Sequence, residues 1–223
     1  MYLIFLVLLV SFFFPVLLFP LLIFAALMLL LLPFKFTIDS FFNLFSVPKQ
    51  IYQIATNQNL RKNHGLEHAT INILEKELGY NGLAGYAEEN GFYIMGVRNP
   101  DFVEEAARKG LRLMKNGKEG LAIHKRCGTS MTVANFLSAI IFLVLLFYSG
   151  HFSILNMIIA IVLSNIFGPF LGQLVQKKLT TSTEVSEMEI KTAYFAENNS
   201  IMNQPVKIFV KTEKIPYVSS QEW

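Results

Sequence analysis

Two histidines and a glutamate lie close together in the segment HGLEHATIN, residues 64–72. On a helix, at about 100° per residue, His68 lies about 40° from His64, so both imidazoles share one face. Glu67 stands to one side of that face, as in the inverted zincin pattern H-x-x-E-H. In that pattern two neutral imidazoles bind Zn²⁺ and the carboxylate takes a proton from water. The segment therefore predicts a zinc-binding helix in which His64 and His68 are ligands and Glu67 is the general base.

Two ligands do not complete a zinc site, and the segment HKRCGTS, residues 124–130, offers His124 and Cys127. Glu75 shares the helical face with the two histidines, but it lies about 10 Å beyond His68 along the helix axis, so we place it outside the coordination shell. With His124 as the third ligand, a water molecule takes the fourth position and the site is catalytic. With Cys127 as a fourth ligand, the site closes and the metal is structural.

Cys127 also permits two hypotheses without a metal. As a nucleophile paired with a histidine, it would be activated by the neighbouring cations Lys125 and Arg126, which favour the thiolate. As a small buried side chain in a tight turn beside Gly128, it would have no chemical role. Of the four hypotheses we favour the catalytic zinc site.

The two segments together resemble the signature of the YqhQ-like family, bacterial multi-pass membrane proteins described as metal-dependent enzymes. That signature pairs an H-G-x-E-H segment with an H-x-R-C-G-T segment, followed by transmembrane helices. The matching residues are His64, Gly65, Glu67, His68, His124, Arg126, Cys127, Gly128 and Thr129. The resemblance implies a metal site in a bacterial membrane protein and leaves the reaction open.

The composition is that of a membrane protein. Hydrophobic residues make up 53% of the 223 residues, and charged residues make up 16%, against about 25% in an average soluble domain. The formal net charge of +3 and the lack of a recognition motif argue against nucleic acid as a partner. The bilayer itself is therefore the partner that the composition predicts.

Two long segments carry no Asp, Glu, Lys or Arg. Residues 1–34 would form a helix of about 51 Å, longer than the roughly 30 Å hydrocarbon core, and Pro15 and Pro20 favour a kink or a break. We expect one kinked span or a re-entrant hairpin there. The second segment, residues 127–176, divides near His151 and predicts two transmembrane helices joined by a short loop.

The expected fold is an α-helical integral membrane protein with a small cytoplasmic α+β region inserted between membrane segments. Its segments are the membrane segment 1–36, the metal-site region 37–130, the transmembrane hairpin 131–176 and a tail, 177–223.

Within the metal-site region, Pro48 interrupts the first helix, a helix over 59–79 ends at Gly79, and Asn90-Gly91 joins two strands of 82–97. Asn99-Pro100 begins a helix that runs to about residue 115. In the tail, MEIKTAYF and VKIFVKT predict a β-hairpin.

The distribution of basic residues predicts the orientation. Of the 19 Lys and Arg residues, 13 lie between Lys35 and Arg126, six lie from Lys177 onward, and the loop near His151 has none. Basic segments stay on the cytoplasmic side of a membrane. The metal-site region and the tail should therefore face the cytoplasm, with the protein in the bacterial cytoplasmic (inner) membrane.

These observations favour a zinc-dependent hydrolase at the cytoplasmic membrane face, most simply a metallopeptidase acting on a membrane-proximal peptide or lipid substrate. His64, His68 and His124 would bind Zn²⁺, Glu67 would activate water, and Arg126 would stabilise the developing oxyanion. The alternative is a non-enzymatic membrane scaffold or assembly factor with a structural zinc site of three His and Cys127.

Overall fold

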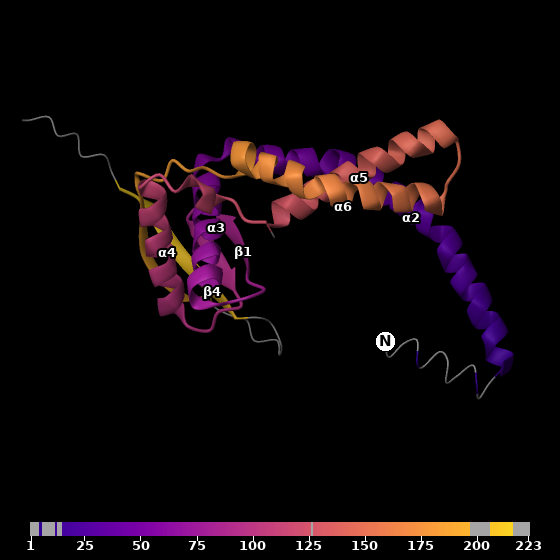
Figure 1. Ribbon diagram of the computed structural model, residues 1–223, viewed down its shortest axis with the longest axis horizontal. Coiled ribbons are helices and arrows are strands. Elements are labelled where there is room, and N and C mark those ends of the chain that lie inside the picture. Colours follow the sequence, from indigo (N-terminus) through magenta and orange to yellow (C-terminus); the bar gives the residue numbers. More distant parts are fainter. Residues whose placement is uncertain (1–4, 6–11, 13–14, 126, 197–205, 216–223) are drawn as a thin grey trace, which may run out of the picture. The chain divides into compact units, whose positions relative to one another are not determined.

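The computed structural model describes residues 15–125, 127–196 and 206–215, together with Phe5 and Phe12; side chains are described from Phe19 onward. The chain folds into two units (Figure 1). The first unit contains Met1–Phe45 and Phe136–Ser164, and the second contains Ser46–Asn135 and Asn165–Trp223. The second unit holds the segments with the predicted zinc ligands.

Three helices of the described chain are long and apolar enough to cross a membrane: α2 from Phe19 onward, α5, and α6 with the turn that follows it. α2 runs over Pro15–Thr56, α5 over Gly128–Ser149 and α6 over Ile154–Val175. The predicted pair of apolar helices joined near His151 is confirmed, although α5 begins at Gly128 rather than Met131.

The prolines of α2 do not end it. Pro20 and Pro48 both lie inside one continuous helix, so the prediction of an interruption at Pro48 is wrong. A proline removes a single backbone hydrogen bond, which a helix of 42 residues can lose, and Val47 beside it is buried. From Pro15 onward the segment is one helix and not a hairpin, and its part before Pro15 lies outside the described residues apart from Phe5 and Phe12.

Two helices of the second unit begin and end where the sequence predicts. α3 (Gln58–Leu78) begins after Asn57, whose side chain accepts from the Leu60 N–H, and ends at Gly79, which has a φ of 71°. α4 (Pro100–Lys115) begins after Asn99, whose side chain accepts from the Asp101 N–H. A left-handed residue after the last turn favours glycine, and asparagine is a strong N-cap.

A four-stranded antiparallel sheet joins segments that the sequence analysis treated separately. β1 (Ala84–Glu88) and β2 (Gly91–Met95) form the first predicted hairpin, although its turn is Glu89-Asn90 and Gly91, predicted as a turn residue, begins β2. β3 (Met188–Phe195) and β4 (Lys207–Lys214) form the second one. β4 also pairs with β2, which gives the order β1-β2-β4-β3. The tail is therefore part of the same sheet as the metal-site region.

One face of this sheet packs against α3 and α4, as Figure 1 shows. The core between the two layers contains fully buried side chains from both helices and from the sheet, among them Leu66, Val103, Phe92, Ile190 and Val210. Because α3 packs against both the sheet and α4, residues 62–74 of α3 are all buried, including its polar ones. Each buried polar side chain on α3 therefore needs a partner inside the protein.

Two glycines bring α6 close to the first turns of α5. A Cβ atom at Gly168 would lie 2.5 Å from the Cβ of Ala134, and one at Gly172 would lie 2.7 Å from the Cα of Ser130. Small residues spaced four apart allow such close packing between apolar helices. This contact fixes the start of α5, which follows Cys127 directly.

Substituting Gly172 by leucine should force the start of α5 away from α6, because the new side chain overlaps Ser130. The free energy of unfolding should fall by about 1–3 kcal/mol, the usual cost of overpacking. Thermal unfolding in detergent measures this change. Phe170→Leu is the matched control, since Phe170 lies on the exposed face of α6; equal effects of the two substitutions would argue against the close contact.

Candidate metal centre

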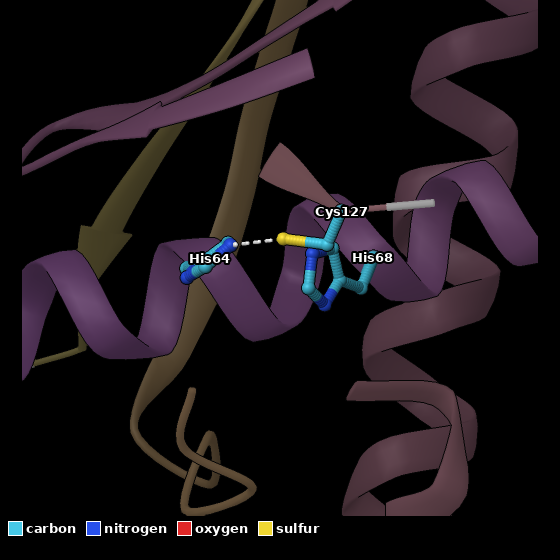
Figure 2. Close-up of side chains that lie close together, drawn as sticks. All are labelled: His64, His68 and Cys127. Carbon is cyan, nitrogen blue, oxygen red and sulfur yellow. Dashed lines mark hydrogen bonds between the residues drawn. The ribbon is translucent and has the colours of Figure 1, made fainter. Parts of the chain in front are cut away.

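Three side chains of the second unit converge on one point: His64, His68 and Cys127 (Figure 2). One ligand atom from each lies within 4.8 Å of the other two, and all three side chains are buried. The histidines come from successive turns of α3, and Cys127 immediately precedes α5. Among the described residues, this is the group of His, Cys, Asp or Glu side chains whose ligand atoms lie close enough together to share a metal ion.

Each histidine of α3 is oriented by a backbone carbonyl. His64 Nδ1 lies 2.9 Å from the oxygen of Thr180, and His68 Nδ1 lies 2.8 Å from the oxygen of Ala122. A carbonyl oxygen only accepts, so both Nδ1 atoms carry the proton and donate it. Both Nε2 atoms therefore present a lone pair, which is the arrangement of a metal-ligating histidine fixed by its outer partner.

The ligand atoms fit a small tetrahedral cation. His64 Nε2 and Cys127 Sγ are 3.3 Å apart, and Sγ also accepts from the Thr129 N–H at 3.3 Å. In a tetrahedral zinc site the nitrogen and sulfur ligands are separated by roughly 3.5 Å, given bond lengths of about 2.0 and 2.3 Å. His68 Nε2 is buried and has no hydrogen-bond partner among the described residues. A cation bound there would satisfy this atom.

Burial favours the neutral form of all three groups. Burial lowers the pKa of His68 to about 3, and nearby His64 lowers it a little further. Burial also lowers the pKa of His64, although the hydrogen bond to the Thr180 carbonyl acts in the opposite direction. Burial also raises the pKa of the Cys127 thiol, so without a metal the thiol keeps its proton and can donate it to His64 Nε2. Neutral imidazoles are the form that binds metal, and a cation would displace the thiol proton.

Glu67 lies beside this cluster on α3. Its side chain is buried, its Oε2 atom has no hydrogen-bond partner among the described residues, and burial raises its pKa to about 8. Its Oε1 atom faces β1 at Gly85, where a Cβ atom would lie 2.7 Å from it. A glycine at this position of β1 therefore leaves room for the carboxyl group.

A cavity of about 210 Å³ joins Glu67 to the metal-binding cluster. Its wall contains His64, Glu67 and Cys127 from the site, residues 85–87 of β1, and the start of α5 at Gly128 and Thr129. Two apolar side chains, Ile54 and Leu60, close the remaining side. The site thus combines metal ligands, a buried carboxyl group and space for a small reacting group.

His124 is placed differently from the prediction. Its Nε2 atom lies 3.2 Å from Oε2 of Glu75, and its ring centre lies 6.0 Å from that of His68. Glu75, which the sequence analysis excluded from the coordination shell, is thus the partner of His124. In this arrangement Cys127, and not His124, completes the group with His64 and His68. Arg126 lies outside the described residues.

The comparisons with known proteins place these residues in one family. Residues 59–193 match the family model described as a domain of unknown function (DUF6391), which covers more than half of the chain. The chain belongs to the DUF6391 family. An uncharacterised protein of Picosynechococcus sp. (strain ATCC 27264 / PCC 7002 / PR-6) is 36% identical over 91 residues, which cover 36% of this chain and 43% of that protein. No solved structure matches.

All the side chains of the metal-binding cluster, together with Glu67, Glu75 and His124, fall inside the DUF6391 domain. The chain matches less than half the length of the cyanobacterial relative. Neither match names the YqhQ-like family or an activity.

Gln176, which no motif of the sequence indicates, holds the Cys127 segment in place. Gln176 opens the short π-helix η2 (Gln176–Thr180) at the end of α6 and is fully buried. Its side chain accepts from the His124 N–H at 3.1 Å, and donates to the His124 carbonyl at 3.1 Å and to the hydroxyl of Ser130. The one sequence signal was an amide side chain at the end of an apolar helix.

In this DUF6391 domain, Arg61 and Asn72 hold the two segments whose carbonyl groups orient the histidines. Arg61 donates to the carbonyls of Lys178 and Thr181, which flank the Thr180 carbonyl that accepts from His64. Asn72 donates to the carbonyls of Leu121 and Ile123, on either side of Ala122. Both residues lie on α3, so this helix carries the histidines and also binds the segments that orient them.

We expect about one metal ion per chain in protein purified gently in detergent. Substitution of His64, His68 or Cys127 by alanine should abolish binding, because only two ligands then remain. His124→Gln should keep the metal, since Glu75 and not the ion contacts His124. Elemental analysis by mass spectrometry measures the content, with His151→Ala in the exposed α5–α6 loop as the control. Metal loss in His124→Gln would restore the three-histidine hypothesis.

The raised pKa of Glu67 predicts how the stability of the metal-free protein depends on pH. Near pH 8 the folded protein still holds much of a proton on Glu67 that the unfolded chain has released, so the free energy of unfolding should fall as pH rises from about 7 to 8. His64 and His68 are neutral in the folded state but half protonated in the unfolded chain at about pH 6.5, so they oppose this slope at lower pH and contribute little only as pH approaches 8. Glu67→Gln should remove most of the slope.

Unfolding temperatures measured in a chelating buffer test this dependence, with Glu75→Gln as the control on the same helix. Equal slopes in the wild-type protein and in Glu67→Gln would contradict the burial of an acidic proton at Glu67.

Proposed function

We propose that this protein is a zinc-dependent hydrolase of the cytoplasmic membrane face, with peptide bonds as its substrate class. In this proposal His64, His68 and Cys127 bind Zn²⁺, the fourth position stays open, and Glu67 is the general base. The proposal keeps the predicted histidines of α3 and the predicted base. It replaces His124 by Cys127 as the third ligand.

The observation that carries the proposal is a pair of buried polar atoms without partners. Glu67 Oε2 and His68 Nε2 are both buried and bond to no described residue, and Glu67 also lines the cavity with His64 and Cys127. Unsatisfied buried polar atoms cost about 1–3 kcal/mol each, so proteins rarely keep them without a use. A cation and a water molecule would satisfy both atoms together.

A bound zinc ion would polarise the substrate carbonyl and make water acidic enough to lose a proton near pH 7. Glu67 would accept that proton and deliver it to the leaving nitrogen. Without a metal, burial raises the pKa of Glu67 to about 8, and the charge of a bound zinc ion would lower it toward neutrality, where a carboxyl group exchanges protons efficiently in both directions. Arg126, adjacent to Cys127 in sequence, would stabilise the oxyanion that develops on the carbonyl oxygen.

The open fourth position distinguishes this proposal from the structural alternative. A structural zinc site needs four protein ligands, and the alternative requires His124 as the fourth. His124 Nε2 instead bonds to Glu75, and Cys127 with two histidines gives a three-ligand set of the catalytic kind. The resemblance of both segments to the YqhQ-like family supports a metal in either case.

The location follows from the apolar helices and the basic residues. Three helices in the described part of the chain are long and apolar enough to cross a membrane, and Cys127 directly precedes one of them, α5. The basic residues gather in the second unit and its flanking segments, which favours the cytoplasmic side of a bacterial inner membrane. The proposed substrate is therefore a membrane-proximal peptide segment. Hydrolysis of a lipid ester or amide instead would change the proposed substrate class.

Glu67→Gln tests the proposed reaction. The substitution keeps the size of the side chain and removes its basicity, so hydrolysis should fall about 10²–10⁴-fold while the zinc content stays near one per chain. Membranes containing either protein are incubated, and newly formed peptide N-termini and released fatty acids are identified by mass spectrometry. Glu75→Gln is the control.

A function in cells that survives Glu67→Gln but is lost in His68→Ala would overturn the enzyme assignment. It would establish the membrane scaffold with a structural metal instead.

A further inference from the structure

β1 is an edge strand with one free side. In the order β1-β2-β4-β3 it pairs only with β2, and no described strand lies along its other side. The two-residue turn at Glu89-Asn90 makes Glu88 and Gly91 a hydrogen-bonded pair, and such pairs alternate along an antiparallel ladder. Gly85 and Ala87 therefore direct their backbone N–H and C=O groups away from β2.

The same two residues lie at the candidate site. Gly85 and Ala87 line the cavity of about 210 Å³ together with His64, Glu67 and Cys127. Their small side chains belong to the sheet face that packs on α3, and the close contact between Gly85 and Glu67 Oε1 leaves no room for a larger one. Unpaired backbone groups and the proposed general base thus meet at one place.

We infer that β1 binds the substrate as an added strand, so that the substrate is an extended, unfolded polypeptide segment. This inference rests on the proposed function. The peptide would bond to the N–H and C=O groups of Ala87 and Gly85, as in other cases of strand addition to a sheet edge. Its scissile carbonyl would then lie in the cavity beside Glu67, between β1 and the Cys127–Thr129 segment.

The lining of the cavity indicates what one substrate side chain must be. Ile54 and Leu60 form an apolar wall, and beyond the residues of the candidate site the polar residues of the lining are the uncharged Tyr86 and Thr129. A charged side chain would be desolvated without a partner, whereas a small apolar one would bury its surface favourably. The segment cleaved is therefore an extended one with a small apolar residue next to the scissile bond.

β1 is held in place by contacts that do not use its outward-facing backbone N–H and C=O groups. Tyr86 stacks on Tyr93 of β2 with ring centres 4.5 Å apart, and Asn63 of α3 donates to the carbonyl of Glu88 at 2.8 Å. A proline at position 87 removes only an N–H that β2 does not use, which edge strands tolerate. Ala87→Pro therefore removes the proposed contact and leaves the strand, and Ala87→Ser is the matched control that keeps the N–H.

The test compares two probes on the full-length, metal-loaded protein in detergent. Acetohydroxamate binds an accessible metal without a peptide part, and a hydroxamate of an alanine- and leucine-containing tripeptide adds an extended chain. Affinities are read from the visible spectrum of the cobalt-substituted protein. In the wild type the peptide hydroxamate should bind at least tenfold more tightly than acetohydroxamate. Ala87→Pro should lose most of that gain, and Ala87→Ser should keep it.

Metal content and acetohydroxamate affinity report whether each variant is folded. Should Ala87→Pro fail to fold, hydrogen exchange of the wild-type protein replaces it: the peptide hydroxamate should slow exchange of the Ala87 amide at least tenfold, and acetohydroxamate should not.

Two results overturn the inference, and they differ in meaning. If acetohydroxamate binds but the peptide part adds nothing to affinity or to protection of β1, the edge strand does not bind substrate and the hydrolase proposal stands. If neither probe perturbs the cobalt spectrum, the metal is inaccessible, and both the hydrolase proposal and this inference fail together.

Discussion

The hydrogen bonds from the two α3 histidines to backbone carbonyls are the constraint on which the site depends. The Thr180 and Ala122 carbonyls fix the proton on Nδ1 of His64 and His68 and so turn both Nε2 atoms toward Cys127. A side-chain acceptor could change its rotamer, but a carbonyl moves only with its backbone. The position of the segments that carry these carbonyls therefore decides whether the ligands converge.

Those segments are held by α3 itself, which explains why so polar a helix is buried. Arg61 binds the carbonyls around Thr180 and Asn72 binds those around Ala122, so each histidine has a second residue of α3 that secures its acceptor. The π-helix η2 contributes Gln176 to the same network by holding His124 and Ser130. Such π-helical turns are frequent at functional sites because they place backbone groups that an α-helix would bond internally.

The sequence predicts the local features of the site and misses the distant ones, for a physical reason. The shared face of His64 and His68 follows from helix geometry alone, and the cap at Asn99 follows from the local sequence. The choice between His124 and Cys127 depends instead on how a loop packs on α3. Only tertiary structure reveals that Glu75 pairs with His124. For the same reason the pairing of β2 with β4 across more than a hundred residues was not foreseen.

A metal bound to Cys127 would also affect how firmly the start of α5 is held. It immediately precedes α5, whose first turns are fixed on α6 by Gly168 and Gly172, so a bond from its sulfur would tie an apolar helix to α3. Without a metal, the same connection depends on one hydrogen bond from a thiol to His64 and on the contacts of Gln176. A thiol is a weak donor, whereas a metal–thiolate bond is strong. Metal binding and the position of the first turns of α5, which belong to the second unit, would therefore be coupled, and a ligand substitution would weaken both.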